Sequence, residues 1–96
     1  MLTGKQRAHL KSMANTMEPV FQIGKNGLTD NFLKQIEDYL EANELVKVKV
    51  LKNSLLDATD MAREIADAVG AEFVQSLGNK FVLYKESKNN KKIQLP

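Results

Sequence analysis

Cysteine is absent from this 96-residue chain, which excludes disulfide bonds, thiolate nucleophiles and zinc sites built on sulfur. No apolar run is long enough to cross a membrane, and no hydrophobic signal-peptide core follows the basic residues near the N-terminus. We therefore expect a cytoplasmic protein, with enough apolar residues for one modest core.

Signatures of catalysis and metal binding are also missing. The single histidine, His9, has no carboxylate or hydroxyl at a spacing that suggests a triad, and we expect it on a helix surface. The acidic pairs Glu37/Asp38 and Asp60/Glu64 fall on exposed helix faces, where carboxylates are normally solvated. No zinc-protease, nucleotide-loop or dinucleotide motif is present. We expect no enzyme activity, no cofactor and no metal ion.

Charge of one sign is not in large excess, because 14 basic and 12 acidic residues give a net charge of +2. The distribution is more informative than the sum. Ten of the acidic residues fall between Asp30 and Glu72, whereas the N-terminal and C-terminal stretches are basic. A cationic face on a nearly neutral protein is compatible with nucleic-acid binding but does not establish it.

Hydrophobic spacing and turn residues predict one small domain. The expected elements, in order, are a helix at 3–17, a strand at 20–23, a helix from 27 or 29 to about 43, a strand at 45–51, a helix at 58–69, and a hairpin of strands 72–77 and 81–85. Right-handed crossovers place the second and third helices on one face of the sheet. The predicted fold is a two-layer α-β-α-β-α-β-β domain with a mixed four-stranded sheet over residues 1–86. A polar, basic and partly ordered tail follows at 87–96.

The first helix combines an apolar stripe with a basic flank. Thr3 and Gln6 form a capping-box pattern. The stripe, which we expect in the core, consists of Leu10, Met13, Ala14 and Met17. Arg7 and Lys11 lie one turn apart beside it, and Lys5 points elsewhere. This flank either is simply solvated or contributes to a binding surface.

The strand at 45–51 alternates strictly. Val46, Val48 and Val50 belong to one face, whereas Lys47 and Lys49 share the other. Such a strand belongs to a sheet that is covered by helices on a single side. The two lysines serve either solubility or binding.

The segment Gly24-Lys25-Asn26-Gly27 connects the first strand to the second helix. Glycine permits positive φ and leaves no Cβ in the way of an approaching molecule. A helix start presents unpaired N–H groups and a partial positive charge, so the segment has the features of a phosphate site. The plainer alternative, a turn that only reverses the chain, stays open because G-x-x-G is a weak string.

A G-x-x-G loop at a helix start is also how KH modules clamp about four nucleotides of RNA backbone. We expect the amides around Lys25 to Leu28 to receive a phosphate, Lys25 to pair with it, and Arg7 and Lys11 to flank the turn. The four phenylalanines look like core residues. Contacts should therefore reach the RNA backbone more than the bases.

Four motifs in the right order, spread over nearly the whole chain, carry a family resemblance. They are 2–7 (LTGKQR), 23–29 (IGKNGLT), 44–50 (ELVKVKV) and the hairpin from Gly78 through FVLYK at 81–85, and the ending KIQLP at 92–96 is similar too. On these motifs the chain resembles the YhbY-like family, the stand-alone bacterial form of the CRM (chloroplast RNA splicing and ribosome maturation) domain.

The resemblance implies an RNA-binding domain with the fold of the C-terminal domain of translation initiation factor 3. It also implies an association with precursors of the large ribosomal subunit. Lys85 stands where many members have arginine, which would lose bidentate phosphate geometry. The candidate RNA-binding residues are Gly24, Lys25, Asn26, Gly27, Leu28, Lys5, Arg7, Lys11, Lys47, Lys49 and Lys85. We expect a monomer. An alternative function is a protein–protein adaptor that docks on the assembling ribosome or an assembly factor through the acidic faces of the second and third helices.

Overall fold

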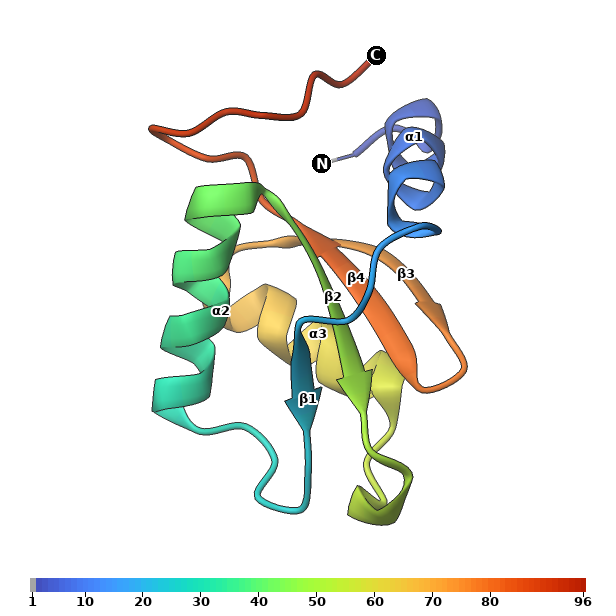
Figure 1. Cartoon of the computed structure of the whole chain (residues 1–96), viewed down its shortest axis with the longest axis vertical. Helices are drawn as coiled ribbons and strands as arrows, with labels where there is room; N and C mark the ends of the chain where they lie inside the picture. The colour runs from blue at the N-terminus through green and yellow to red at the C-terminus, as the bar shows by residue number, and fades with distance from the viewer. Residues whose placement is uncertain (1) are drawn as a thin grey trace.

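The computed structural model describes residues 2–96. Its elements are α1 (Gly4–Ala14), β1 (Phe21–Ile23), α2 (Asp30–Asn43), β2 (Leu45–Val50), the short 3-10 helix η1 (Lys52–Ser54), α3 (Ala58–Val69), β3 (Glu72–Leu77) and β4 (Lys80–Tyr84). The strands form one sheet in the order β1-β2-β4-β3, with β1 parallel to β2 and the other pairs antiparallel (Figure 1). The predicted α/β class, with three helices and a mixed four-stranded sheet, is confirmed.

The main core lies between α2, α3 and one face of the sheet. The alternation in β2 directs every second side chain into this core, where Val46, Val48 and Val50 are all buried. Ile36 and Leu40 of α2 and the apolar stripe of α3 complete the same cluster. The prediction that both helices cover one face is confirmed.

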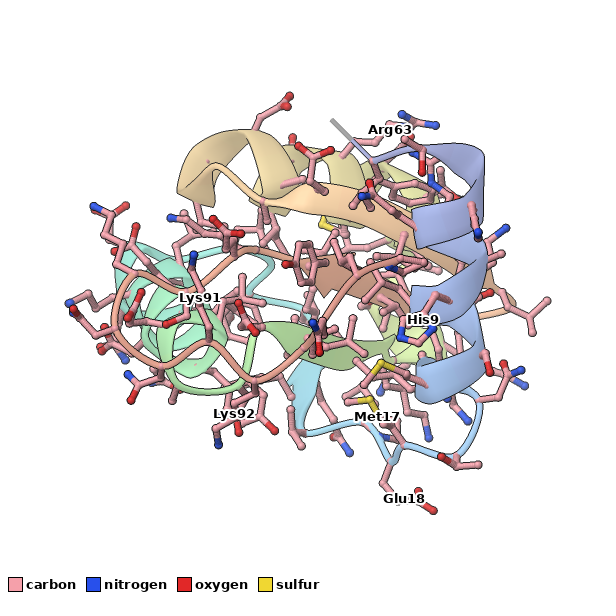
Figure 2. The ribbon with its side chains drawn as sticks, turned by 90° about the horizontal axis from the view of Figure 1, so that it is seen from above. His9, Met17, Glu18, Arg63, Lys91 and Lys92 are labelled. Atoms are coloured by element: carbon pink, nitrogen blue, oxygen red, sulfur yellow. The ribbon has the colours of Figure 1, made fainter. Side chains whose placement is uncertain are left out.

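The alternation in β2 had indicated that the opposite face of the sheet carries no helix. This prediction was wrong. Leu10 and Ala14 of α1 are buried there, together with Leu45, Val82 and Tyr84 of the sheet. Figures 1 and 2 show α1 and α2 on opposite sides of the sheet. In Figure 1, α1 packs near the upper end of the strands, and the loop after β1 and the β3–β4 turn lie at the lower end.

Helix α1 is shorter than the predicted 3–17. Its start is as predicted, because the Gln6 amide donates to Thr3 Oγ1 and the Thr3 amide donates to Gln6 Oε1, each at 3.1 Å. The predicted end at residue 17 was wrong. The assignment of Met13 to the core was also wrong, since Met13 is 38% exposed. Lys47 Nζ donates to the carbonyls of Ala14 and Met17, both at 3.1 Å. This cation stabilises one carbonyl at the last residue of α1 and one just beyond it, where the chain leaves the helix.

The other boundaries follow their capping residues. Thr29 and Asp57 accept backbone N–H bonds at the starts of α2 and α3, and Gly70 ends α3 in the left-handed conformation. Residues Gly78 and Asn79 connect β3 to β4, with φ +62° at Gly78. Strand β4 therefore begins one residue earlier than predicted, within the usual uncertainty of element ends.

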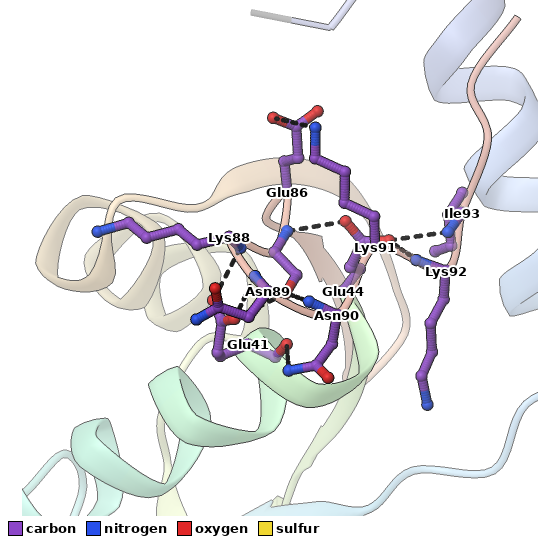
Figure 3. A network of polar contacts seen from close by, with 10 residues as sticks. Glu41, Glu44, Glu86, Lys88, Asn89, Asn90, Lys91, Lys92 and Ile93 are labelled. Carbon is purple, nitrogen blue, oxygen red and sulfur yellow. Dashed lines mark hydrogen bonds and ion pairs between the residues drawn. The ribbon is translucent and has the colours of Figure 1, made fainter.

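The C-terminal segment 87–96 contains no helix or strand, yet its backbone is fixed by two carboxylates of α2 and its C-cap (Figure 3). Glu44, fully buried, accepts from the amides of Ser87 at 2.7 Å, Lys92 at 2.7 Å and Ile93 at 2.8 Å. Burial raises the pKa of the Glu44 carboxyl, but these amide bonds outweigh it and hold the pKa below its usual value. Glu41 accepts from the next amides along the segment, and these bonds lower its pKa as well.

Apolar contacts hold the far end of this segment. Ile93 and Leu95 are half-buried against the cluster beneath α1. Residues 87–96 therefore form part of the packed structure, beside α1 in Figure 1. The domain boundary at residue 86 stays a prediction.

Candidate nucleic-acid interface

The Gly24–Gly27 segment is a tight turn closed by its own backbone. The Gly27 amide donates to the Gly24 carbonyl at 3.0 Å, and Gly27 has φ +63°, a conformation that favours glycine. Gly24 has an ordinary φ, and a Cβ there would meet Leu51 Cδ1 at 3.7 Å, a normal contact. The backbone therefore needs glycine at the second position of the motif and not at the first.

Three backbone donors of this turn are free. Within residues 2–96, the amides of Lys25, Asn26 and Leu28 have no hydrogen-bond acceptor. Lys25 and Asn26 are exposed, whereas Leu28 packs its side chain against the main core. The turn therefore combines unpaired amides with one exposed cation, as an anion site requires, and Leu28 anchors it.

The turn is separated from α2 by Leu28 and by Thr29, which is one of the two caps that the sequence predicted for this helix. The helix begins at Asp30, and the Phe32 amide is already occupied by Thr29 Oγ1 at 3.1 Å. Asp30 places a negative charge in the first turn, where it offsets the positive end of the helix dipole. An anion at this site would rely on the amides of the turn and on lysine, with little help from the helix.

A second loop lies against the turn. Because β1 and β2 are parallel neighbours, both strands finish at the same end of the sheet. The Leu51 amide there donates to the Ile23 carbonyl at 2.9 Å. Lys52, which is exposed on η1, follows Leu51 directly and therefore lies at the same end of the sheet as the turn. Sequence reasoning missed Lys52. The predicted crossover between two parallel strands was the available signal, because such strands end side by side.

Arg7 and Lys11 do not flank the turn. They line a groove of about 600 Å³ together with residues of α3 and β3. Strand β3 and strand β1 are the two edge strands of the sheet. Three strand spacings separate them, which amounts to about 14 Å. The expected flanking position was wrong because it followed chain continuity, whereas strand order decides which elements meet.

The groove brings in a cation that sequence reasoning missed, Arg63 of α3 (Figure 2). Its guanidinium carbon lies 4.9 Å from the centroid of the Phe73 ring, a cation–π contact. From the other side, Arg7 Nε donates to the Phe73 carbonyl at 3.4 Å. Arg63 is the only basic residue of α3, which was the available signal.

Two of the predicted binding lysines have structural roles. Lys47 holds the end of α1, as described above, and Lys85 Nζ donates to the Val69 carbonyl at the end of α3 at 2.7 Å. Lys49 is half-buried on the sheet and Lys5 is exposed on α1. Neither Lys49 nor Lys5 forms an ion pair with another described residue.

Other kinds of site have little support in the part of the chain that the structure describes. No cluster of three or more possible metal ligands occurs within residues 2–96. Among the same residues, no helix combines the length and the apolar character needed to cross a membrane. His9 is exposed on α1, where the sequence placed it (Figure 2).

The comparisons with known proteins cover nearly the whole chain. The sequence model of the CRS1 / YhbY (CRM) domain matches residues 2–85. A Bacillus subtilis protein named "Probable RNA-binding protein YqeI" is 51% identical over 96 residues, the full length of both chains. A Haemophilus influenzae protein named "RNA-binding protein" is 39% identical over 95 residues, which cover 99% of this chain and 95% of the relative.

A solved structure shares the fold. The solution structure of SAV1595 from Staphylococcus aureus superposes with a TM-score of 0.82 at 49% identity, and the match covers the whole of both chains. The family match covers far more than half of the sequence and includes the glycine turn, the sheet and all three helices. The chain belongs to the CRS1 / YhbY (CRM) domain family.

Proposed function

We propose that this protein binds RNA and that the Gly24–Gly27 turn grips the sugar–phosphate backbone. The observation that carries the proposal is the set of free amides of Lys25, Asn26 and Leu28 on an exposed turn. Lys25 and Lys52 add positive charge at the same end of the sheet. RNA is the ligand because relatives of similar length carry RNA-binding names.

The RNA that we propose is ribosomal RNA in a precursor of the large subunit, bound in the cytoplasm by a monomer during assembly. This assignment is supported by the association with large-subunit precursors that the resemblance to the YhbY-like family implies. Contacts to the backbone suit such a role, since a protein that grips phosphates reads little sequence by itself. No catalytic step and no cofactor belong to the proposal.

The test is binding of large-subunit ribosomal RNA by the variant Lys25→Asp/Asn26→Asp at several salt concentrations. Loss of one phosphate contact should lower the log–log salt slope by about 0.7 and weaken binding. A matched control, Lys34→Asp/Gln35→Asp, makes the same change of charge on the exposed face of α2. Circular dichroism should show that all three proteins are equally folded.

Equal binding by the wild type and the turn variant would refute the proposed grip. The adaptor hypothesis predicts a different result, namely that the protein still sediments with assembly particles after RNase digestion. Part of the acidic face on which that hypothesis rests is occupied, because Glu41 binds the C-terminal segment and Asp38 pairs with Lys34 at 2.9 Å.

A further inference from the structure

One row of side chains crosses all four strands on the face that α1 only partly covers. The strand registers align Gln22 with Lys49, Lys49 with Lys80, and Lys80 with Leu77. Alternation puts Lys49 on the same face as Lys47, whose amine reaches the end of α1. Gln22 directly precedes the last residue of β1, so the row begins beside the Gly24–Gly27 turn.

The centre of the row is electrostatically unfavourable in the protein alone. Lys49 and Lys80 are direct cross-strand neighbours, and like charges in this position destabilise a sheet. Among residues 2–96, neither ammonium is paired with a carboxylate. A bound anion would relieve this repulsion.

The row leads to the groove at the opposite edge. A hollow of about 260 Å³ lies beyond the end of α1, and it is lined by Lys80, Gln75 and Leu77, among others. Gln75 and Leu77 also line the groove that contains Arg7, Lys11 and Arg63. The two depressions therefore meet at β3, and cations follow one another from one edge of the sheet to the other.

We propose that a single RNA strand held at the Gly24–Gly27 turn continues across this row, with phosphates on Lys49 and Lys80, and ends in the groove beside β3. There Arg7, Lys11 and Arg63 bind further phosphates. This inference rests on the proposed function and extends it. It adds Lys80 and Arg63 to the binding residues and gives the bound RNA a direction across the sheet.

The groove is a poor site for the other ligand that open sheet edges attract, an extended acidic peptide. Adding a strand needs a regular row of free backbone groups. Strand β3 has a register shift between Phe73 and Gln75, and Arg7 already occupies the Phe73 carbonyl. A bulged edge that is flanked by cations favours a phosphate backbone over a β-strand.

The test compares two oligonucleotides on the full-length protein. A strand of about 4 nucleotides is long enough for the turn alone, and a strand of about 12 nucleotides is long enough for the whole path. The variants are Lys49→Gln/Lys80→Gln and Arg63→Gln, with Lys34→Gln on α2 as the control. An acidic peptide, polyglutamate, is titrated in parallel.

Each variant should bind the long strand about tenfold more weakly, with a salt slope lower by about 0.7 per contact, and should bind the short strand like the wild type. The double lysine variant should also be at least as stable as the wild type in urea, because a repulsion is removed. That pairing of weaker binding with undiminished stability separates a binding role from a folding defect.

Four outcomes would overturn the inference. Unchanged binding of the long strand, with the turn variant still impaired, would leave the proposed function intact and remove the path. An equal loss on both strands would mean that the turn itself was disturbed. A loss that is seen only with polyglutamate would assign the surface to a protein partner. If the wild type binds neither strand, the proposed function fails as well.

Discussion

Replacement of the buried Glu44 by glutamine should destabilise the whole domain, although residue 44 is far from any proposed RNA contact. Glu44 Oε1 accepts from the amides of Lys92 and Ile93, and Oε2 accepts from the amide of Ser87. The carboxylate is fully buried, so these bonds have little competition from water. Glutamine has the same shape but only one acceptor oxygen.

The loss can be estimated from these bonds. If the amide oxygen replaces Oε1, the side-chain NH2 faces the Ser87 N–H, and leaving that buried donor unpaired costs about 1–3 kcal/mol. The two remaining bonds lose their charge assistance, at about 1 kcal/mol each. Release of the C-terminal segment limits the total, so we expect about 3 kcal/mol, which lowers Tm by about 12 °C or more in a domain of this size.

The assay is thermal and urea unfolding, followed by circular dichroism from neutral pH to about pH 3. The folded-state pKa of Glu44 lies below its unfolded value of about 4.3. Its stabilisation is therefore complete above the unfolded pKa and is lost as pH falls through the folded pKa. The difference between the wild type and Glu44→Gln should be largest near neutral pH and shrink in acid.

Glu64→Gln is the matched control, since Glu64 is an exposed carboxylate on α3. It should unfold like the wild type at every pH. Two results would refute the reasoning. One is an unchanged Tm for Glu44→Gln at neutral pH, and the other is a difference from the wild type that persists undiminished in acid.

Two further predictions concern the glycine turn and the end of α3. Gly27→Ala should lose about 1–2 kcal/mol in urea unfolding because φ is +63°, whereas Gly24→Ala should be nearly neutral; equal effects would contradict this account of the turn. Lys85→Met should lose about 1–2 kcal/mol, since the Val69 carbonyl loses a charged donor at 2.7 Å. Lys85→Met should also leave RNA affinity unchanged, and a drop in affinity without a loss of stability would return Lys85 to the binding surface.

Sequence reasoning succeeded where the signal was local. The capping box of Thr3 and Gln6, the Thr29 cap and the alternation in β2 depend on residues within one or two turns of each other. It failed for the end of α1 because the deciding contact comes from Lys47, more than thirty positions from Ala14. No local pattern at residues 13–17 contains that information.

By itself, the sequence determined the α/β class, the three helices, the glycine turn and the free lysine at its tip. Only the tertiary structure decided which cations belong together. Strand β4 pairs with β2, which moves β3 to the far edge and with it the groove of Arg7 and Arg63. The same pairing aligns Lys49 with Lys80 and turns Lys47 and Lys85 toward helix ends. The physical reason is that side-chain period is a property of each segment, whereas strand order depends on backbone pairing between distant segments.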